Sequence, residues 1–201
     1  LIAGIVGEVV SRFGADPQRI FVAGLSAGAA MAVVLGETYP ELFAGVGVHS
    51  GLPFRSAHDM GWAMAAMKGG RSGLPGMKTA PAATPRHPAL HAVPTIVFHG
   101  DHDHTVQAVN ADQVVQQARE AFEAQPGASE LRANTQTGAT PAGRRYTRTV
   151  FTDAGGRSCI ESWTVHGAGH AWSGGDASGS FTDASGPDAS AEMVRFFLAL
   201  A

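Results

Sequence analysis

The sequence predicts an α/β protein in which a mostly parallel sheet is flanked by helices. Short apolar runs bounded by turn residues alternate with Ala-rich or amphipathic segments, which is the order of a parallel sheet with helical crossovers. The runs are apolar almost throughout, as expected of strands that are covered on both faces. The expected strands span 19–24, 44–49, 93–100, 144–153 and 158–166, and the expected helices span 1–13, 27–38, 55–68, 110–124 and a closing segment from 187.

The helices follow from apolar spacing and from the residues that begin or end a helix. Apolar residues recur at helical spacing from residue 2 until Gly14, which is a suitable C-cap. The second helix has to end before Pro40. Asn110 and Gln113 have the spacing of a capping box, so we expect the fourth helix to begin there.

The remaining segments predict turns and loops inside one domain that spans 1–201. Gly and Pro recur without periodicity from about 69 to 92, which indicates an irregular insertion, and 125–143 predicts a second loop. Ala154 to Arg157 form a turn between the last two strands, and Pro187 with Asp188 opens the last helix.

Composition excludes several classes of function. A formal net charge of -3 leaves no basic surplus for a nucleic-acid backbone, and no stretch approaches the ~20 apolar residues that span a bilayer. The single cysteine, Cys159, excludes an internal disulfide framework and a cysteine-based metal site. Leu1 already lies in the first expected helix, so we expect further N-terminal strands to be missing from this chain.

Gly24-Leu25-Ser26-Ala27-Gly28 fits the G-x-S-x-G pattern of a nucleophile elbow. The pattern lies where an expected strand ends and an expected helix begins, which is the context that such a serine requires. We therefore predict that Ser26 is a nucleophile and that the backbone N–H of Ala27 donates to an oxyanion.

A serine nucleophile needs a base, and the base needs an acid that orients it. Asp103 and His170 each follow an expected strand, and with Ser26 they give the chain order Ser, Asp, His of α/β-hydrolases. Asp101 is expected to bond only its own turn, and His166 to be a packing or hydrogen-bonding residue at a strand end.

These residues belong to longer blocks that resemble the polyhydroxybutyrate depolymerase family of esterases, in the α/β-hydrolase superfamily. The blocks are Arg19 to Gly28 with Met31, Tyr39-Pro40, Phe43 to Gly45, His49 to Pro53, Val93 to Val106, Trp163 to Gly175, and Gly186 to Ser190. The resemblance implies a partial α/β-hydrolase fold, a Ser26, Asp103 and His170 triad, and no metal or organic cofactor. It also implies that the second oxyanion donor lies upstream of Leu1, so we expect the intact parent protein to be an active esterase and this chain alone to be weak or inactive.

The resemblance implies a serine esterase that cleaves short hydroxyalkanoate esters or polymers and is extracellular. The alternative on the same fold is a polysaccharide deacylase, an acetyl xylan or feruloyl esterase. Leu25 and Trp172 are the candidate substrate contacts, whereas helical spacing favours core packing for Met60, Met64 and Met67.

Two hypotheses that assign the chain to other functional classes remain open. Imidazole and carboxylate groups from His99, Asp103 and His104 could hold zinc or manganese in a metal-dependent hydrolase. The chain could also keep the fold as a non-catalytic binding protein, because a fold does not entail an activity.

Overall fold

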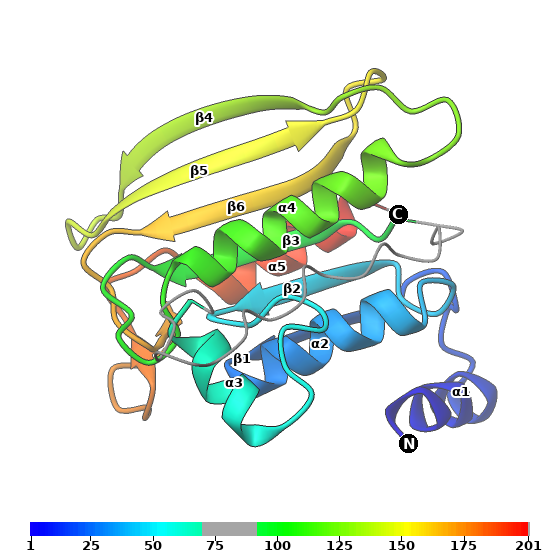
Figure 1. The fold of residues 1–201 in the computed structure, drawn as a ribbon, viewed down its shortest axis with the longest axis horizontal. Coiled ribbons are helices and arrows are strands. Elements are labelled where there is room, and N and C mark those ends of the chain that lie inside the picture. Colours follow the sequence, from blue (N-terminus) through cyan, green and yellow to red (C-terminus); the bar gives the residue numbers. More distant parts are fainter. Residues whose placement is uncertain (70–91, 201) are drawn as a thin grey trace.

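The computed structural model describes residues 1–69 and 92–200, and it contains a six-stranded sheet with the strand order β1-β2-β3-β6-β5-β4 (Figure 1). The first four strands in this order run parallel, and β5 and β4 continue the sheet as an antiparallel pair. The strand bounds are Phe21–Leu25 (β1), Gly45–His49 (β2), Thr95–Gly100 (β3), Arg132–Ala139 (β4), Arg145–Thr152 (β5) and Ser158–Val165 (β6).

Helices cover both faces of the sheet, because alternate side chains of the central strands point to opposite sides. Val46, Val48 and Val97 pack with α2 and α4, whereas Ile96 and Phe98 pack with α5. The helix bounds are Ile2–Phe13 (α1), Ala27–Thr38 (α2), Met60–Met67 (α3), Val109–Glu123 (α4) and Ala189–Leu198 (α5).

The buried strands and the first helix confirm the sequence predictions. Every residue of β2 and of β3 is buried, as continuous apolar runs indicate. α1 ends at Gly14 in the left-handed conformation with φ 65°, the expected C-cap. The turn before Arg157 joins β5 to β6, since Asp153 and Arg157 pair across it.

The prediction of a loop over 125–143 is wrong, because β4 occupies Arg132–Ala139. This strand lies at the edge of the sheet and is almost wholly exposed, so it carries no apolar pattern. It is held by its ladder with β5 and by a hydrogen bond between the hydroxyls of Thr135 and Thr149 at 2.9 Å.

Three further predictions about helices are wrong. α4 begins at Val109, and the Asn110 side chain donates to the carbonyl oxygen of Gln107 instead of capping the helix. The third helix starts at Met60 rather than at residue 55, because Asp59 caps it by accepting from the N–H of Trp62. Met60 and Met64 are 79% and 58% exposed, so they do not pack in the core.

The last two sequence predictions concern the insertion at about 69–92 and the lack of a membrane-spanning segment. The irregular insertion expected at about 69–92 lies, from Gly70 to His91, outside the described residues. None of the helices within the described ranges combines the length and the hydropathy that crossing a bilayer requires.

Candidate active site

The four parallel strands end at one edge of the sheet (Figure 1). The predicted site residues lie in the loops that follow these strands. Ser26 follows β1, Asp103 follows β3, and His170 follows β6. The carboxyl edge of a parallel sheet is where open α/β folds bind their ligands. The topology therefore brings residues that are far apart in the sequence to a single edge.

Ser26 occupies a strained turn between β1 and α2, with φ 58° and ψ -119°. A non-glycine residue in such a conformation costs about 1–3 kcal/mol and is typical of functional sites. The N–H of Ser26 is fixed by donating to the carbonyl oxygen of His49 at 2.9 Å. A Cβ on Gly24 would overlap the backbone of Gly28, so only glycine lets the strand and the helix approach this closely.

The residue that follows the serine presents a free donor. Ala27 is the first residue of α2, and its N–H donates to no acceptor within the described part of the chain. Its position at a helix N-terminus adds the positive end of the helix dipole. This donor is the one that the nucleophile-elbow prediction assigned to an oxyanion.

Asp103 and His170 form a short hydrogen bond, with 2.7 Å between Oδ2 of Asp103 and Nδ1 of His170. The other carboxylate oxygen accepts from the N–H groups of Thr105 and Val106, at 2.9 and 2.8 Å. Burial raises the pKa of Asp103, but the hydrogen bonds from His170 and Val106 outweigh it, so that the pKa lies below its ordinary value. Because an ionised carboxylate only accepts, Nδ1 of His170 is the donor in this bond, and Nε2 is left as the ring nitrogen that can accept a proton.

The structure does not join Ser26 to His170 by a hydrogen bond. Among the described residues no hydrogen bond reaches the Ser26 hydroxyl, whereas the His170 ring is bonded to Asp103. Catalytic hydrogen bonds are commonly long or misaligned in ligand-free enzymes and tighten when substrate binds. The structure thus brings the acid and the base together and places the serine at the same sheet edge.

Glycine at position 100 lets the loop that carries His170 lie across the end of β3. A Cβ there would be 2.6 Å from the carbonyl carbon of Ala168. The N–H of His102 donates to the oxygen of that same carbonyl at 3.0 Å. The acid loop and the histidine loop are therefore held against each other by backbone contacts.

The expectation that Asp101 bonds only its own turn is wrong. Its two carboxylate oxygens accept from Nδ1 of His166 at 2.8 Å and from the N–H of Gly167 at 2.6 Å. His166 is a hydrogen-bonding residue at a strand end, as expected, and its Nε2 contacts the hydroxyl of Thr147 at 2.9 Å. A second carboxylate and imidazole pair therefore lies beside the first.

The two candidate substrate contacts differ in their surroundings. Leu25 is the last residue of β1 and is half-buried, next to Ser26. Trp172 stacks on the ring of His49 with 5.1 Å between centroids, and its Nε1 donates to the hydroxyl of Ser190 at 3.1 Å. The indole is thus engaged with the protein on one face and at its nitrogen.

Of the side chains proposed for a metal site, His99 and Asp103 lie close together, with 3.5 Å between Nε2 of His99 and Oδ2 of Asp103. Nε2 of His99 donates to the carbonyl oxygen of Val106 at 2.8 Å, and His104 is exposed. Within residues 1–69 and 92–200, no three His, Cys, Asp or Glu side chains form a group that could hold a metal ion. The metal-dependent alternative therefore has no donor set in the described residues.

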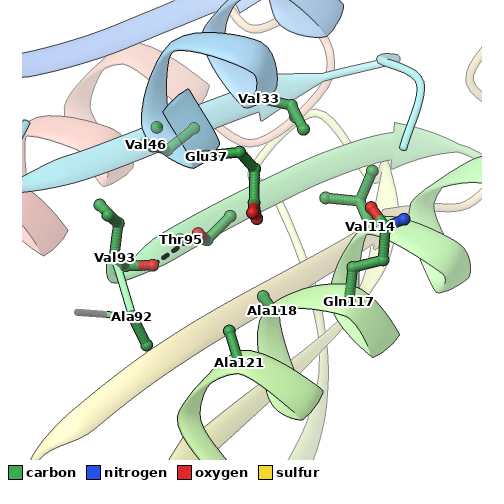
Figure 2. A pocket seen from close by; sticks show the side chains of 11 residues that line it. Val33, Glu37, Val46, Ala92, Val93, Thr95, Val114, Gln117, Ala118 and Ala121 are labelled. Carbon is green, nitrogen blue, oxygen red and sulfur yellow. Dashed lines mark hydrogen bonds between the residues drawn. The ribbon is translucent and has the colours of Figure 1, made fainter. Parts of the chain in front are cut away.

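Two hollows in the structure lie away from Ser26. A cavity of about 30 Å³ lies among α2, β2, β3 and α4, near the amino ends of the strands (Figure 2). It has room for about one water molecule and is too small for an ester substrate. A polar cleft of about 470 Å³ lies at the carboxyl edge, beside Asp101, Arg144 and His166.

The fold defines an α/β-hydrolase, and similar solved structures agree with that class. The acetyl xylan esterase from Aspergillus awamori superposes with a TM-score of 0.63 at 22% identity, over 98% of this chain and 66% of that one. A PHB depolymerase complexed with an R3HB trimer gives 0.55 at 17% identity, over 90% of this chain and 52% of that one.

The chain belongs to the Esterase PHB depolymerase family, whose sequence model matches residues 1–138. Poly(3-hydroxyalkanoate) depolymerase C of Paucimonas lemoignei is 30% identical over 186 residues, which cover 84% of this chain and 39% of that protein. Feruloyl esterase B of Talaromyces stipitatus is 28% identical over 84% of this chain and 46% of that protein. The family prediction is confirmed, and the chain spans less than half the length of each of these two relatives.

Proposed function

We propose that the protein is a serine-dependent carboxylic ester hydrolase in which Ser26, His170 and Asp103 act as nucleophile, base and acid. The observation that carries the proposal is the 2.7 Å hydrogen bond between Asp103 and His170, at the sheet edge where Ser26 occupies its strained turn. In the neutral imidazole this bond fixes the proton on Nδ1, so that Nε2 is the nitrogen available as the general base.

The reaction proceeds in two acyl-transfer steps. Nε2 of His170 takes the hydroxyl proton of Ser26 while Oγ attacks the ester carbonyl carbon, and the N–H of Ala27 donates to the oxyanion that forms. The tetrahedral intermediate collapses, the proton passes from His170 to the leaving alcohol oxygen, and an acyl-serine remains. Water, deprotonated by His170, then attacks the acyl carbon, and Ser26 recovers its proton as the carboxylic acid leaves.

We propose short hydroxyalkanoate esters, or polymers of them, as the substrate class. The support is family membership together with the 30% identity to a poly(3-hydroxyalkanoate) depolymerase over 84% of this chain. Leu25 and Trp172 are proposed as contacts for the acyl chain. An extracellular location is part of the proposal and rests on the family resemblance alone.

Removal of an acyl group from a polysaccharide is the second candidate function. It is favoured by acetylxylan esterase A of Aspergillus awamori, which is 49% identical over 51 residues, 25% of this chain and 17% of that protein. Both candidates use the same residues in the same roles. They differ only in the alcohol and acyl groups that the site accepts.

A substrate panel on wild type, Ser26→Ala and Ser129→Ala tests both parts of the proposal. The panel contains p-nitrophenyl esters, 3-hydroxybutyrate oligomers and acetylated xylan. Ser129 is exposed in a loop, so its substitution is the matched control. We expect Ser26→Ala to lose on the order of 10⁴ to 10⁶ in turnover. Retained hydrolysis in that variant, with Ser129→Ala unchanged, would reject Ser26 as the nucleophile.

A further inference from the structure

The loop that carries His170, residues 166–175, contains the short strand β7 (Trp172–Ser173), which pairs with β8 (Thr182–Asp183). Side chains outside the proposed triad also contact this loop at both ends. Toward its carboxyl end, the N–H of Ser173 donates to Nε2 of His49 at 2.9 Å. At its amino end, His166 and Gly167 both donate to Asp101. His170 lies between these two anchors, so each anchor restricts where its imidazole can go.

His49 is built to remain a hydrogen-bond acceptor. It is only 1% exposed at the end of β2, and its ring stacks on Phe98 and on Trp172 with centroids 5.8 and 5.1 Å away. Because the N–H of Ser173 can only donate, Nε2 of His49 is unprotonated, and Nδ1 donates to the hydroxyl of Ser50 at 3.2 Å. Burial lowers the pKa of His49 to about 3, with smaller contributions from His99 and His170, so the acceptor is present at neutral pH.

The same imidazole also connects the histidine loop to the serine turn. The carbonyl oxygen of His49 accepts from the N–H of Ser26, and its ring accepts from the N–H of Ser173. One residue at the end of β2 therefore holds the backbone next to the proposed nucleophile and the backbone three residues beyond the proposed base. This residue therefore links the two segments directly, and the hydroxyl of Ser173 adds a separate bond to the carbonyl oxygen of Pro187 at 2.7 Å.

His166 connects the other end of the loop to Asp101, which follows β3, and to β5. His166 contacts Asp101 through Nδ1 and the hydroxyl of Thr147 through Nε2, at 2.8 and 2.9 Å. Arg144 adds a hydrogen bond from its guanidinium to the carbonyl oxygen of His166 at 3.2 Å. The start of the loop is thus fixed in two directions, toward β3 and toward β5.

We propose that His49 and Asp101 are positioning residues that hold the His170 loop in register with Ser26 and Asp103. This inference rests on the proposed function for its kinetic consequences and on the hydrogen bonds alone for its structural ones. A displacement of about 1 Å at a catalytic group can reduce turnover on the order of 10²-fold without a change in substrate contacts. The signature of the two residues is therefore an effect on kcat rather than on KM.

The first test compares His49→Phe, His49→Gln and His58→Phe by steady-state kinetics on a p-nitrophenyl ester. Phenylalanine keeps the stacking and loses the acceptor, whereas Oε1 of glutamine can reach the former position of Nε2. We expect His49→Phe to lower kcat about 10- to 100-fold with KM within about threefold, and His49→Gln to recover most of the loss. His58 is largely exposed, and its variant is the control.

The second test follows the proton between His170 and Asp103 by ¹H NMR and does not require activity. This proton resonates far downfield of the amide region, and its exchange with water reports how firmly the pair is held. We expect faster exchange in His49→Phe and in Asp101→Ala than in wild type. Asp101→Asn, which keeps an acceptor for the N–H of Gly167, should lie between the two, and the exposed Asp16→Ala should match wild type.

The outcomes separate this inference from the proposed function. Ester hydrolysis that is unchanged by Ser26→Ala, with the expected NMR differences, would reject the proposed serine mechanism and support the anchors. Unchanged exchange and unchanged kcat in His49→Phe would overturn the role of His49, and a glutamine variant as impaired as the phenylalanine variant would assign it to packing. If His49→Phe does not fold, steady-state kinetics and proton exchange are measured on Asp101→Asn and His49→Gln instead. Wild-type values of both kcat and exchange after loss of the Asp101 charge would overturn the role of Asp101.

Discussion

Gly100 and Ala168 lie so close that a Cβ on the glycine would be 2.6 Å from the carbonyl carbon of the alanine. This contact sets the separation between the loop of Asp103 and the loop of His170, because the N–H of His102 bonds the same carbonyl group. The hydrogen bond between Asp103 and His170 depends on that separation.

Replacing Gly100 by alanine is therefore expected to separate the two loops. We expect Gly100→Ala to lower the free energy of unfolding by about 1–3 kcal/mol through overpacking, and to lower kcat. Urea unfolding and ester hydrolysis measure the two effects. Wild-type stability together with wild-type kcat would show that the histidine loop is not fixed by this contact.

The two glycines of the G-x-S-x-G motif are expected to respond differently to alanine. A Cβ on Gly24 would be 2.7 Å from the amide nitrogen of Ala29, whereas a Cβ on Gly28 would have nothing within 4 Å. Gly28 lies in α2, so alanine there should raise stability by up to about 1 kcal/mol through helix propensity. Thermal unfolding of Gly24→Ala and Gly28→Ala checks this. Equal losses in both variants would contradict the contact geometry.

His49 makes stability depend on pH. Its pKa is lowered from 6.5 to about 3, so between these values the unfolded chain binds a proton that the folded protein does not. The contribution of His49 to the free energy of unfolding is therefore fully present above pH 6.5. It falls by about 1.4 kcal/mol per pH unit as the pH is lowered from 6.5 toward 3.

The measurement is the free energy of unfolding by urea at several pH values between 4 and 6.5, in wild type and in His49→Gln. We expect the wild-type slope to exceed that of the variant by roughly the amount due to one proton. His99, whose burial also lowers its pKa, contributes in the same direction in both proteins. Parallel slopes would mean that His49 is protonated in the folded state.

Glu161 is a buried carboxylate that joins β6, β5 and α5. It is 1% exposed and accepts from Arg148 at 2.8 and 3.0 Å and from Arg195 at 2.6 Å. Burial raises the pKa of Glu161, but hydrogen bonds from the two guanidinium groups bring it below its ordinary value, so the group is a carboxylate.

Glu161→Gln is expected to cost about 2 kcal/mol, less than the 3–5 kcal/mol of a fully buried pair because both guanidinium groups reach solvent. Glu192→Gln is the control, since its pair with Arg195 lies near the surface and should contribute under about 1 kcal/mol. Chemical unfolding measures the loss of free energy of unfolding in both variants. Equal effects would show that burial does not distinguish the two pairs.

The sequence predicts the buried strands and their loops because these elements depend on local pattern. β2 and β3 are mostly apolar and are buried along their whole length, and the loops after parallel strands have to meet at one edge. Ser26, Asp103 and His170 could be proposed on that basis. The hydrogen bond between Asp103 and His170 then appears in the structure, whereas one from His170 to Ser26 does not.

Other features depend on contacts that no local pattern reveals. β4 is polar and exists because its backbone pairs with β5 at the sheet edge. The anchoring contact between His49 and Ser173 joins residues 124 positions apart, and a histidine at a strand end does not indicate its partner. Asp101 resembles any turn aspartate until the fold brings His166 and Gly167 to it.

Active-site labelling tests the central claim most directly. Wild type, Ser26→Ala and Asp103→Asn are incubated with a p-nitrophenyl phosphonate, and the labelled peptide is located by mass spectrometry. We expect one phosphonyl group on Ser26 in wild type, none in Ser26→Ala, and much slower labelling in Asp103→Asn, because His170 then loses its orienting carboxylate. A label on another residue, or none on wild type, would contradict the assignment of Ser26 as a nucleophile activated by His170.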